Sequence, residues 1–339
     1  MAGRGNGGAE TYAADMVLAL HAAGVAQTAV WHPEQVRFAA LREAGVRVAP
    51  DIFRQKLRFL QRASLVHLLK TERPDLIHCW MRRAAAILPT GLTIPAIGWF
   101  GGYYDVRHFK ACRHFIGVTP AIVEHQRAHG VPPDCSHFIP TFPTLDLAPA
   151  LERATLDTPA TAKILLALSR LHPKKGLDVL LQALVQLPDC YLWLAGDGPL
   201  LPELRQLAAR LGVAERVRFL GWRQDRGALL RAADICVLPS RYEPFGTVML
   251  EAWAAQVPLV AAAAAGPAAF VRHEVNGMLV PVDDAVALAG ALRQVLDHPA
   301  LRASLCAGGR ATFEAQFTRP AVTRQMQALY EKILAEPQG

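Results

Sequence analysis

Short apolar, β-rich runs alternate along this chain with longer segments of helical periodicity. The runs are TAVWHP (28–33), VRVAPDI (46–52), LIHCW (76–80), AIGWF (96–100), HFIGVT (114–119) and HFIP (137–140), then KILLALSR (163–170), CYLWLAG (190–196), VRFLG (217–221), ICVLPS (235–240), PLVAA (258–262) and GMLVP (277–281). Nearly continuous apolar runs are typical of parallel strands that helices cover on both faces. The pattern therefore predicts an α/β protein with two Rossmann-like, doubly wound domains.

The two series of runs are separated by a segment rich in Pro, Ala and Thr. We interpret residues 147–162 as a linker between an N-terminal domain of residues 1–146 and a C-terminal domain of residues 163–318. At 339 residues the chain is long enough for a sizeable core in each domain. A last helical pattern covers residues 319–336.

The N-terminal residues form a Gly-rich turn that enters a helix. In a βα unit such a turn follows a strand, but only Met1 and Ala2 precede Gly3. The first strand of a doubly wound sheet is usually internal, so its loss would leave two neighbouring strands without partners. We therefore expect that the first N-terminal strand is missing and that the recorded sequence starts inside the gene product.

Composition narrows the class of protein. Hydrophobic content is 52% and charged content 19%, which is typical of a folded chain and excludes a disordered one. No run of about 18 apolar residues and no signal-peptide pattern occurs, so we expect a cytoplasmic protein without a membrane span. The six scattered cysteines form no metal-ligand spacing and indicate reduced, mostly buried thiols. The net charge of +7 indicates an anionic partner, but no nucleic-acid-binding module is recognisable.

Part of the positive charge is concentrated in residues 51–73. There, basic residues interleave with apolar ones at helical spacing: Arg54, Lys56, Arg58, Arg62, Lys70 and Arg73 with Phe53, Leu57, Leu60, Leu65 and Leu68. An apolar stripe with a basic flank is typical of helices that lie on anionic lipid. The segment predicts peripheral contact with the inner face of the cytoplasmic membrane. The alternative is an ordinary helix that packs on the core and has a solvated face.

In open α/β sheets, ligands bind beyond the carboxyl ends of the strands. Arg170 ends the run KILLALSR, and Lys174 and Lys175 follow it, before the helical segment GLDVLLQAL. A guanidinium and an ammonium at a helix N-terminus predict a diphosphate site. A solvated loop is the alternative. In the GDGP turn (196–199), Gly198 allows close approach of the backbone to a ligand, although a turn without a ligand fits equally well.

The segment YEPFGTVMLEAWAA (242–255) places two acids eight residues apart, Glu243 in a loop and Glu251 one turn inside a helix. Gly246 permits close backbone approach, and the amides of Thr247 and Val248 are free at the helix start. A phosphate would bind these amides, and the two carboxylates would accept hydrogen bonds from sugar hydroxyls. Without a ligand, Glu251 would be an acid favoured by the helix dipole and Glu243 a solvated loop acid.

Taken together, the segments SRLHPKKG, LAGDGP, FLGW, ADICVLPSRYEPFGTVMLEAWA, PLVA and VNGMLVP resemble glycosyltransferase family 4. These are retaining enzymes of the GT-B fold, in which two Rossmann-like domains face a cleft. The resemblance extends over most of residues 163–320 and includes the E-x7-E element, here Glu243 and Glu251. The N-terminal half is similar through GGAE (7–10), PDLIHCW and GVTPAIVEH.

The resemblance implies roles for individual residues. It implies an N-terminal acceptor-binding domain, a C-terminal domain that binds a nucleotide-sugar donor, and a final helix that crosses back to the N-terminal domain. Arg170 and Lys175 would hold the donor diphosphate and stabilise the leaving group, Glu251 would bind the ribose, and Glu243 would bind the transferred sugar. Further donor contacts would come from the glycines and the loop at the helix start: Gly7, Gly8, Gly198, Phe245, Gly246, Thr247 and Val248. No cofactor or metal is implied, and a UDP-sugar is the favoured donor.

The chain departs from the family at one place that bears on catalysis. Many members carry a His near the position of Gly101 or Gly102, and this chain has none there. His78 ends a predicted strand and is a candidate for the cleft, although a hydrogen-bonded structural His is the commoner case. The predicted activity is transfer of a sugar to a glycan or glycolipid, with lipopolysaccharide synthesis as the leading context. The alternatives are a nucleotide-sugar epimerase on the same fold and a catalytically weak donor-binding remnant.

Overall fold

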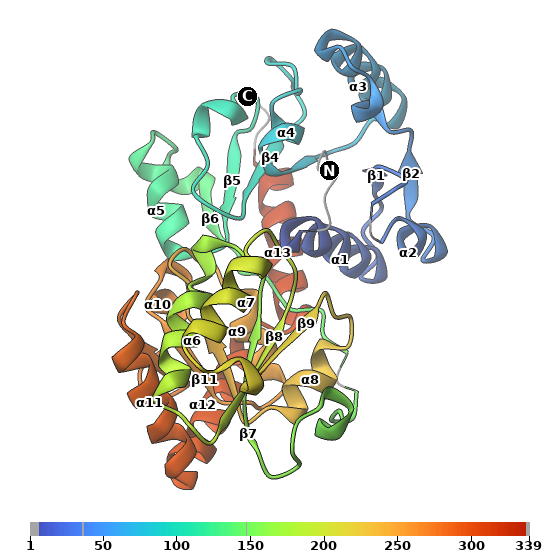
Figure 1. Cartoon of the computed structure of the whole chain (residues 1–339). Coiled ribbons are helices and arrows are strands. Elements are labelled where there is room, and N and C mark those ends of the chain that lie inside the picture. Colours follow the sequence, from blue (N-terminus) through green and yellow to red (C-terminus); the bar gives the residue numbers. More distant parts are fainter. Residues whose placement is uncertain (1–6, 36, 147, 337–339) are drawn as a thin grey trace. The chain divides into compact units, whose positions relative to one another are not determined.

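The computed structural model describes residues 7–35, 37–146 and 148–336 (Figure 1). The chain divides into two compact units. Unit 1 contains Met1–Phe142 and Thr318–Gly339, and unit 2 contains Pro143–Phe317. Each unit is built around parallel strands, so the predicted α/β class with two Rossmann-like domains is confirmed.

Unit 2 contains a sheet of six parallel strands in the order β12-β11-β10-β7-β8-β9. The strands are β7 (Lys163–Leu168), β8 (Cys190–Ala195), β9 (Val217–Gly221), β10 (Ile235–Leu238), β11 (Leu259–Ala262) and β12 (Met278–Val280). The helices of this unit are α6 (Leu177–Val185), α7 (Leu201–Arg210), α8 (Arg226–Ala232), α9 (Thr247–Ala254), α10 (Ala265–Phe270), α11 (Ala285–Asp297) and α12 (Pro299–Gln316). After β7 the chain builds the sheet in one direction through β9, and from β10 it builds in the other. The loops after β7 and β10 therefore meet at the point where the strand order reverses, which is where doubly wound sheets bind ligands.

Unit 1 contains a two-stranded sheet, β1-β2, and a four-stranded sheet, β3-β4-β5-β6. The strands are β1 (Thr28–Val30), β2 (Arg47–Ala49), β3 (Ile77–Trp80), β4 (Ala96–Phe100), β5 (His114–Gly117) and β6 (Ser136–Phe138). The helices are α1 (Gly8–Ala22), α2 (Phe38–Glu43), α3 (Arg58–Glu72), α4 (Met81–Ala85), α5 (Pro120–Ala128) and α13 (Arg319–Ala335). Each of these strands overlaps a predicted run, and β6 begins one residue before its run. Among the described residues no strand precedes α1, and the predicted Gly-rich turn at residues 3–6 lies outside them.

The segment predicted as a linker packs on unit 2. Of residues 147–162, residue 147 lies outside the described part of the chain. The amide of Leu151 donates to the carbonyl of Ala228, and Arg153 bonds to the carbonyl of Ala232 at 2.9 Å. Trp193 donates its indole N–H to Thr158 at 3.0 Å. Pro and Ala content indicated an irregular segment, but it did not reveal these contacts with distant residues.

The basic segment of residues 51–73 is divided into two elements. Asp51 caps a short 3-10 helix at Ile52–Arg54, and α3 begins only at Arg58. Within α3 only Leu65 is buried, so the helix packs on the core less than its length would allow. In the described part of the chain, no helix is both long enough and apolar enough to cross a bilayer.

Candidate active site

The loops after β7 and β10 bring the predicted catalytic residues of unit 2 together. Lys175 ends a 3-10 turn at Pro173–Lys175, directly before α6. Its ammonium lies 2.5 Å from Oε2 of Glu243, which belongs to the loop between β10 and α9. Both side chains are largely shielded from solvent. The buried hydroxyl of Ser240 also lies near Glu243, with its oxygen 3.4 Å from Oε2. The sequence placed Lys175 and Glu243 in one site, and the structure places them in direct contact.

Glu251 is an acid held within the core of unit 2. Its residue is 1% exposed, and its Oε1 accepts a hydrogen bond from Arg226, the first residue of α8. Burial raises the pKa of Glu251 to about 7, although the charge and hydrogen bond of Arg226 act to lower it. The second oxygen, Oε2, is buried and has no hydrogen-bond partner among the described residues. A buried acceptor without a donor is costly, so a ligand that donates a hydrogen bond there would be stabilised.

The start of α9 provides a second set of unused groups. Gly246 is the N-cap of α9 and has a φ of +91°, a conformation that glycine adopts without strain. No side chain caps this helix, and the amides of Thr247 and Val248 have no acceptor in the described part of the chain. Free amides at a helix N-terminus bind anions. Phe245 is buried and packs edge-on against Phe270, with the ring centroids 5.4 Å apart.

Glycines allow these loops to pack closely. A Cβ at Gly176 would lie 2.0 Å from the carbonyl oxygen of Pro239, so the loops after β7 and β10 can touch only with glycine at 176. A Cβ at Gly198 would lie 2.4 Å from the carbonyl oxygen of Leu171. The absence of a side chain at Gly198 thus serves contact between the β7 and β8 loops. Its predicted contact with the donor stays a prediction.

Arg170 and Lys174 differ in their surroundings. Arg170 is exposed and has no ion pair among the described residues, so its guanidinium is available to an anion. The ammonium of Lys174 lies over the ring of Tyr242, 4.5 Å from its centroid. The structure therefore separates the three cations of this loop: Lys175 lies beside Glu243, Lys174 beside an aromatic ring, and Arg170 in solvent.

The remaining predicted residues belong to unit 1. Gly7 is the N-cap of α1 and Gly8 is its first residue. His78 lies on β3, where its Nδ1 is 2.6 Å from the hydroxyl of Tyr330 on α13. Its ring stacks on Trp80, and burial lowers its pKa to about 3. These contacts are those of a neutral structural histidine, the alternative that the sequence left open, and contact of His78 with a ligand stays a prediction.

Sequence reasoning missed three residues that support this site. Arg226 balances the charge of Glu251 and also bonds to the carbonyl of Thr144 at 3.2 Å. Ser240 lies beside Glu243, and Gly266 donates its amide to the carbonyl of Glu243 at 2.7 Å. A Cβ at Gly266 would lie 2.2 Å from the carbonyl oxygen of Phe245. Ser240 stands three residues before Glu243 in the segment ADICVLPSRYEPFGTVMLEAWA, so the sequence contained a signal for it. Arg226 and Gly266 lie outside that segment, and no motif links them to the two acids.

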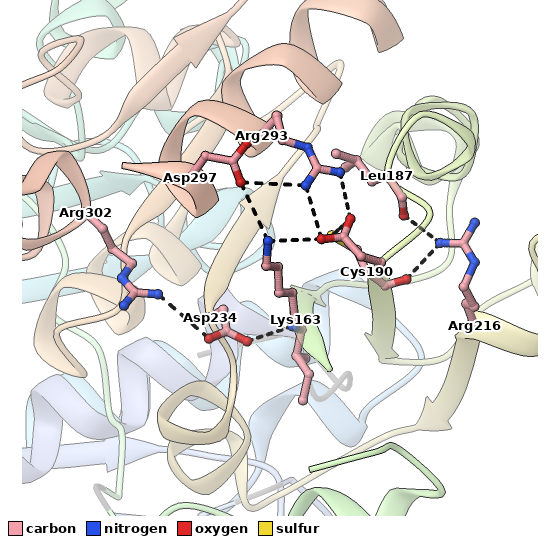
Figure 2. Close-up of polar contacts among 10 residues, drawn as sticks. Lys163, Leu187, Cys190, Arg216, Asp234, Arg293, Asp297 and Arg302 are labelled. Atoms are coloured by element: carbon pink, nitrogen blue, oxygen red, sulfur yellow. Dashed lines mark hydrogen bonds and ion pairs between the residues drawn. The ribbon is translucent and has the colours of Figure 1, made fainter. Parts of the chain in front are cut away.

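The opposite edge of the same sheet, where the strands begin, has a different arrangement of charge (Figure 2). Lys163 and Arg293 bind Asp189 at 3.0 and 2.7 Å, and Asp297 lies 3.6 Å from Lys163. The hydrogen bond from Arg293 contributes most to holding the pKa of Asp189 well below its usual range. Figure 2 also shows Arg216, which donates to the carbonyls of Leu187 and Cys190 at 2.7 and 2.8 Å. The charges of Lys163, Arg293, Asp189 and Asp297 are thus paired with one another.

Comparison with known proteins agrees with the fold. Residues 6–146 match the family model "Glycosyltransferase Family 4", and residues 162–298 match "Glycosyl transferases group 1". Two proteins of Rhizobium meliloti (strain 1021), the lipopolysaccharide core biosynthesis glycosyltransferases LpsD and LpsE, are each 34% identical to the chain. The LpsD match covers 97% of this chain and 96% of LpsD, and the LpsE match covers 94% of each.

The solved structure of Anabaena HepE in complex with UDP-glucose has the same fold. Its TM-score is 0.81 at 23% identity, and the match covers 97% of each chain. Two Rossmann-like units with parallel sheets, together with these matches, define a glycosyltransferase of GT-B architecture. The chain belongs to glycosyltransferase family 4.

Proposed function

We propose that this glycosyltransferase moves a sugar from a nucleotide-diphosphate sugar to a lipid-linked saccharide of the lipopolysaccharide core, with retention and without a metal. The observation that carries the proposal is the buried Glu251, with a free acceptor oxygen, at the end of the sheet where the helix amides of Thr247 and Val248 are also free. A nucleoside diphosphate has hydroxyl donors and phosphate acceptors in one molecule, which is the combination that these groups require.

Charged residues would perform the remaining steps. The guanidinium of Arg170 and the ammonium of Lys175 would bind the diphosphate and stabilise the charge that grows on it as the sugar leaves. Glu243 would orient the transferred sugar through a hydroxyl. The leaving phosphate would help to accept the proton of the acceptor hydroxyl, so the reaction would not need a dedicated protein base. UDP is the favoured carrier, and the complex of HepE with UDP-glucose supports it.

The acceptor assignment has two supports. The relatives LpsD and LpsE are both lipopolysaccharide core glycosyltransferases, and they match this chain over nearly its whole length. Unit 1 also presents apolar and basic side chains together on α3 and the residues just before it. Leu57, Phe59 and Leu60 are 52%, 65% and 42% exposed. The exposed cations Arg54, Lys56, Arg58, Arg62 and Lys70 lie around them.

Such a surface suits a lipid-linked acceptor, because apolar side chains enter the lipid while cations bind anionic headgroups. We expect the chain to sediment with vesicles of phosphatidylglycerol and to stay in solution with vesicles of phosphatidylcholine. Phe59→Ser with Arg58→Glu should abolish sedimentation. A matched control is Val286→Ser with Arg127→Glu, which changes an exposed apolar residue and an exposed cation elsewhere. Equal binding by both double variants would refute the membrane contact.

The experiment that tests the donor site is a thermal-shift screen of the purified chain against nucleoside diphosphates and their sugars. A ligand that binds only the native state raises the melting temperature. We expect a shift with one diphosphate sugar that is lost in Glu251→Ala. A folded Glu251→Ala protein that keeps the whole shift would refute the site, and the absence of a shift with every nucleotide would refute the proposed donor class.

A further inference from the structure

Arg241 joins three loops at the edge of the unit 2 sheet where the strands end. It lies in the loop after β10, two residues before Glu243. Its guanidinium donates two hydrogen bonds to the carboxylate of Asp178 on α6, at 2.8 and 2.6 Å, and one to the carbonyl of Pro173 at 2.9 Å. Its Nε donates to Asp283, in the loop after β12, at 2.5 Å. Each nitrogen of the guanidinium is thus used within unit 2.

The turn that contains Lys175 is also held by the backbone of the loop after β10. The amides of Arg241 and Tyr242 both donate to the carbonyl of Lys174, at 2.9 and 3.1 Å. On the other side of Lys175, Gly176 packs directly on the backbone of the same loop. Lys175 therefore lies between two residues that contact this loop, in a turn whose first residue accepts a hydrogen bond from the Arg241 side chain.

The ion pairs of Arg241 are suited to fixing geometry more than to stabilising the fold. The side chains of Arg241, Asp178 and Asp283 are all partly exposed. Such ion pairs contribute little to the free energy of unfolding, because water screens them. A bidentate guanidinium–carboxylate pair nevertheless fixes the direction of both groups. The hydrogen bond from Arg241 also holds the pKa of Asp178 below its usual range, so this carboxylate stays charged.

We propose that Arg241 is a positioning residue that holds Lys175 beside Glu243 in the geometry that sugar transfer requires. The inference rests on the proposed function, because Arg241 acts through the ammonium of Lys175. In the structure that ammonium lies 2.5 Å from the carboxylate of Glu243. A misplacement of about 1 Å near the reacting atoms can lower turnover about a hundredfold. Arg241 keeps the turn in one position without itself binding the donor.

The first test is a double-mutant cycle, with hydrolysis of UDP-glucose as the probe reaction and released UDP as the readout. We expect Arg241→Ala to lower kcat by about 10- to 100-fold and to change the Kd of UDP-glucose by less than about threefold. In a Lys175→Ala background the same substitution should lower kcat by no more than about twofold, because its effect passes through Lys175. Losses that simply multiply in the double variant would overturn the proposal.

Two further variants separate geometry from charge and from general loosening of the fold. Arg241→Lys keeps the charge but loses the bidentate fork, so it should stay impaired. Full activity of Arg241→Lys would overturn the proposal. Arg293→Ala is the matched control, because Arg293 makes a partly exposed, bidentate pair with Asp189 at the opposite edge of the sheet. It should leave kcat unchanged, and a loss equal to that of Arg241→Ala would also overturn the proposal.

A second measurement needs no donor, and it decides the proposal even if UDP-glucose is not a substrate. Competitive acetylation with acetic anhydride reports how freely the ammonium of Lys175 leaves Glu243. We expect Lys175 to react at least about threefold faster in Arg241→Ala than in the parent and in Arg293→Ala. The exposed Lys70 of α3 is the internal reference.

The acetylation result also distinguishes a failure of this inference from a failure of the proposed function. Equal acetylation of Lys175 in the parent and in Arg241→Ala would overturn the inference, whatever the donor is. Faster acetylation together with an unchanged kcat for Lys175→Ala would support the hold of Arg241 on Lys175, and it would refute the catalytic role that the proposed function gives to Lys175.

Discussion

The two edges of the unit 2 sheet use charge in opposite ways. Where the strands begin, Asp189 is bound by Lys163 and Arg293, and its lowered pKa shows that its charge is favoured. Where the strands end, Glu251 is buried with one unpartnered oxygen, and its pKa is raised. The first arrangement is complete within the protein and the second is not. Because raised pKa values and unpartnered groups are concentrated at functional sites, this contrast supports our proposal that the ligand binds where the strands end.

The largest expected effect is on turnover and concerns Lys175. Lys175→Ala should lower kcat by about 10²- to 10³-fold, since charge on the leaving phosphate grows in the transition state. Donor binding should weaken much less. Steady-state kinetics together with donor titration separate the two effects. Lys163→Ala, at the opposite edge, is the control and should leave kcat unchanged. Equal losses in kcat and donor affinity for Lys175→Ala would show that Lys175 only binds.

The next effect is on donor affinity and concerns Glu251. Glu251→Ala should raise the donor Kd by about tenfold or more, because a hydrogen bond to a charged group contributes about 1.5 to 3 kcal/mol. Calorimetric titration with the diphosphate sugar found in the thermal screen measures this change. A folded variant with an unchanged Kd would remove Glu251 from the ribose site.

A third effect is the pH dependence of stability in the absence of ligand. Between the ordinary pKa of 4.5 and the folded value of about 7, the folded state holds more protons at Glu251 than the unfolded state. The free energy of unfolding should therefore fall as pH rises through this window, by at most about 1.4 kcal/mol per pH unit. Urea unfolding at several pH values tests this, with Glu251→Gln as the comparison. A variant with the same pH slope as the parent would contradict the raised pKa.

The smallest expected effect is on stability and concerns Asp189, at the edge of the unit 2 sheet where the strands begin. Asp189→Asn should lower the free energy of unfolding by only about 0.2 to 1 kcal/mol, because the side chain is partly exposed and water screens its ion pairs. Donor affinity should not change. Urea unfolding and donor titration of this variant measure both quantities. A loss of donor affinity comparable to that of Glu251→Ala would abolish the contrast between the two edges.

Within the site, the sequence was more informative about individual residues than about their partners. The E-x7-E element indicated Glu243 and Glu251, and the segment after residue 170 indicated Lys175. The sequence did not indicate that Lys175 and Glu243 form an ion pair, nor that Arg226 balances the charge of Glu251. Residue spacing is informative within one helix or turn, whereas these pairs join elements that are 68 and 25 residues apart in the chain.

The same distinction applies to the basic segment of residues 51–73. Its periodicity indicated an amphipathic helix, but the helix begins at Arg58 and buries only Leu65. Apolar residues at helical spacing predict a shared face. Whether that face is covered depends on the other elements that pack against it, and these come from distant parts of the chain.

The sequence by itself determined the α/β class, the positions of the described strands and the family, because each depends on local pattern or on motifs of contiguous residues. Only the tertiary structure decided the strand order, and with it the switch point that brings the loops after β7 and β10 together. It also decided which charges are compensated by partners from distant segments, as at Asp189, and which buried acceptor, Oε2 of Glu251, has no hydrogen-bond partner among the described residues. The physical reason is that burial, pKa and unpaired backbone groups are properties of contacts between distant segments, and no local pattern specifies them.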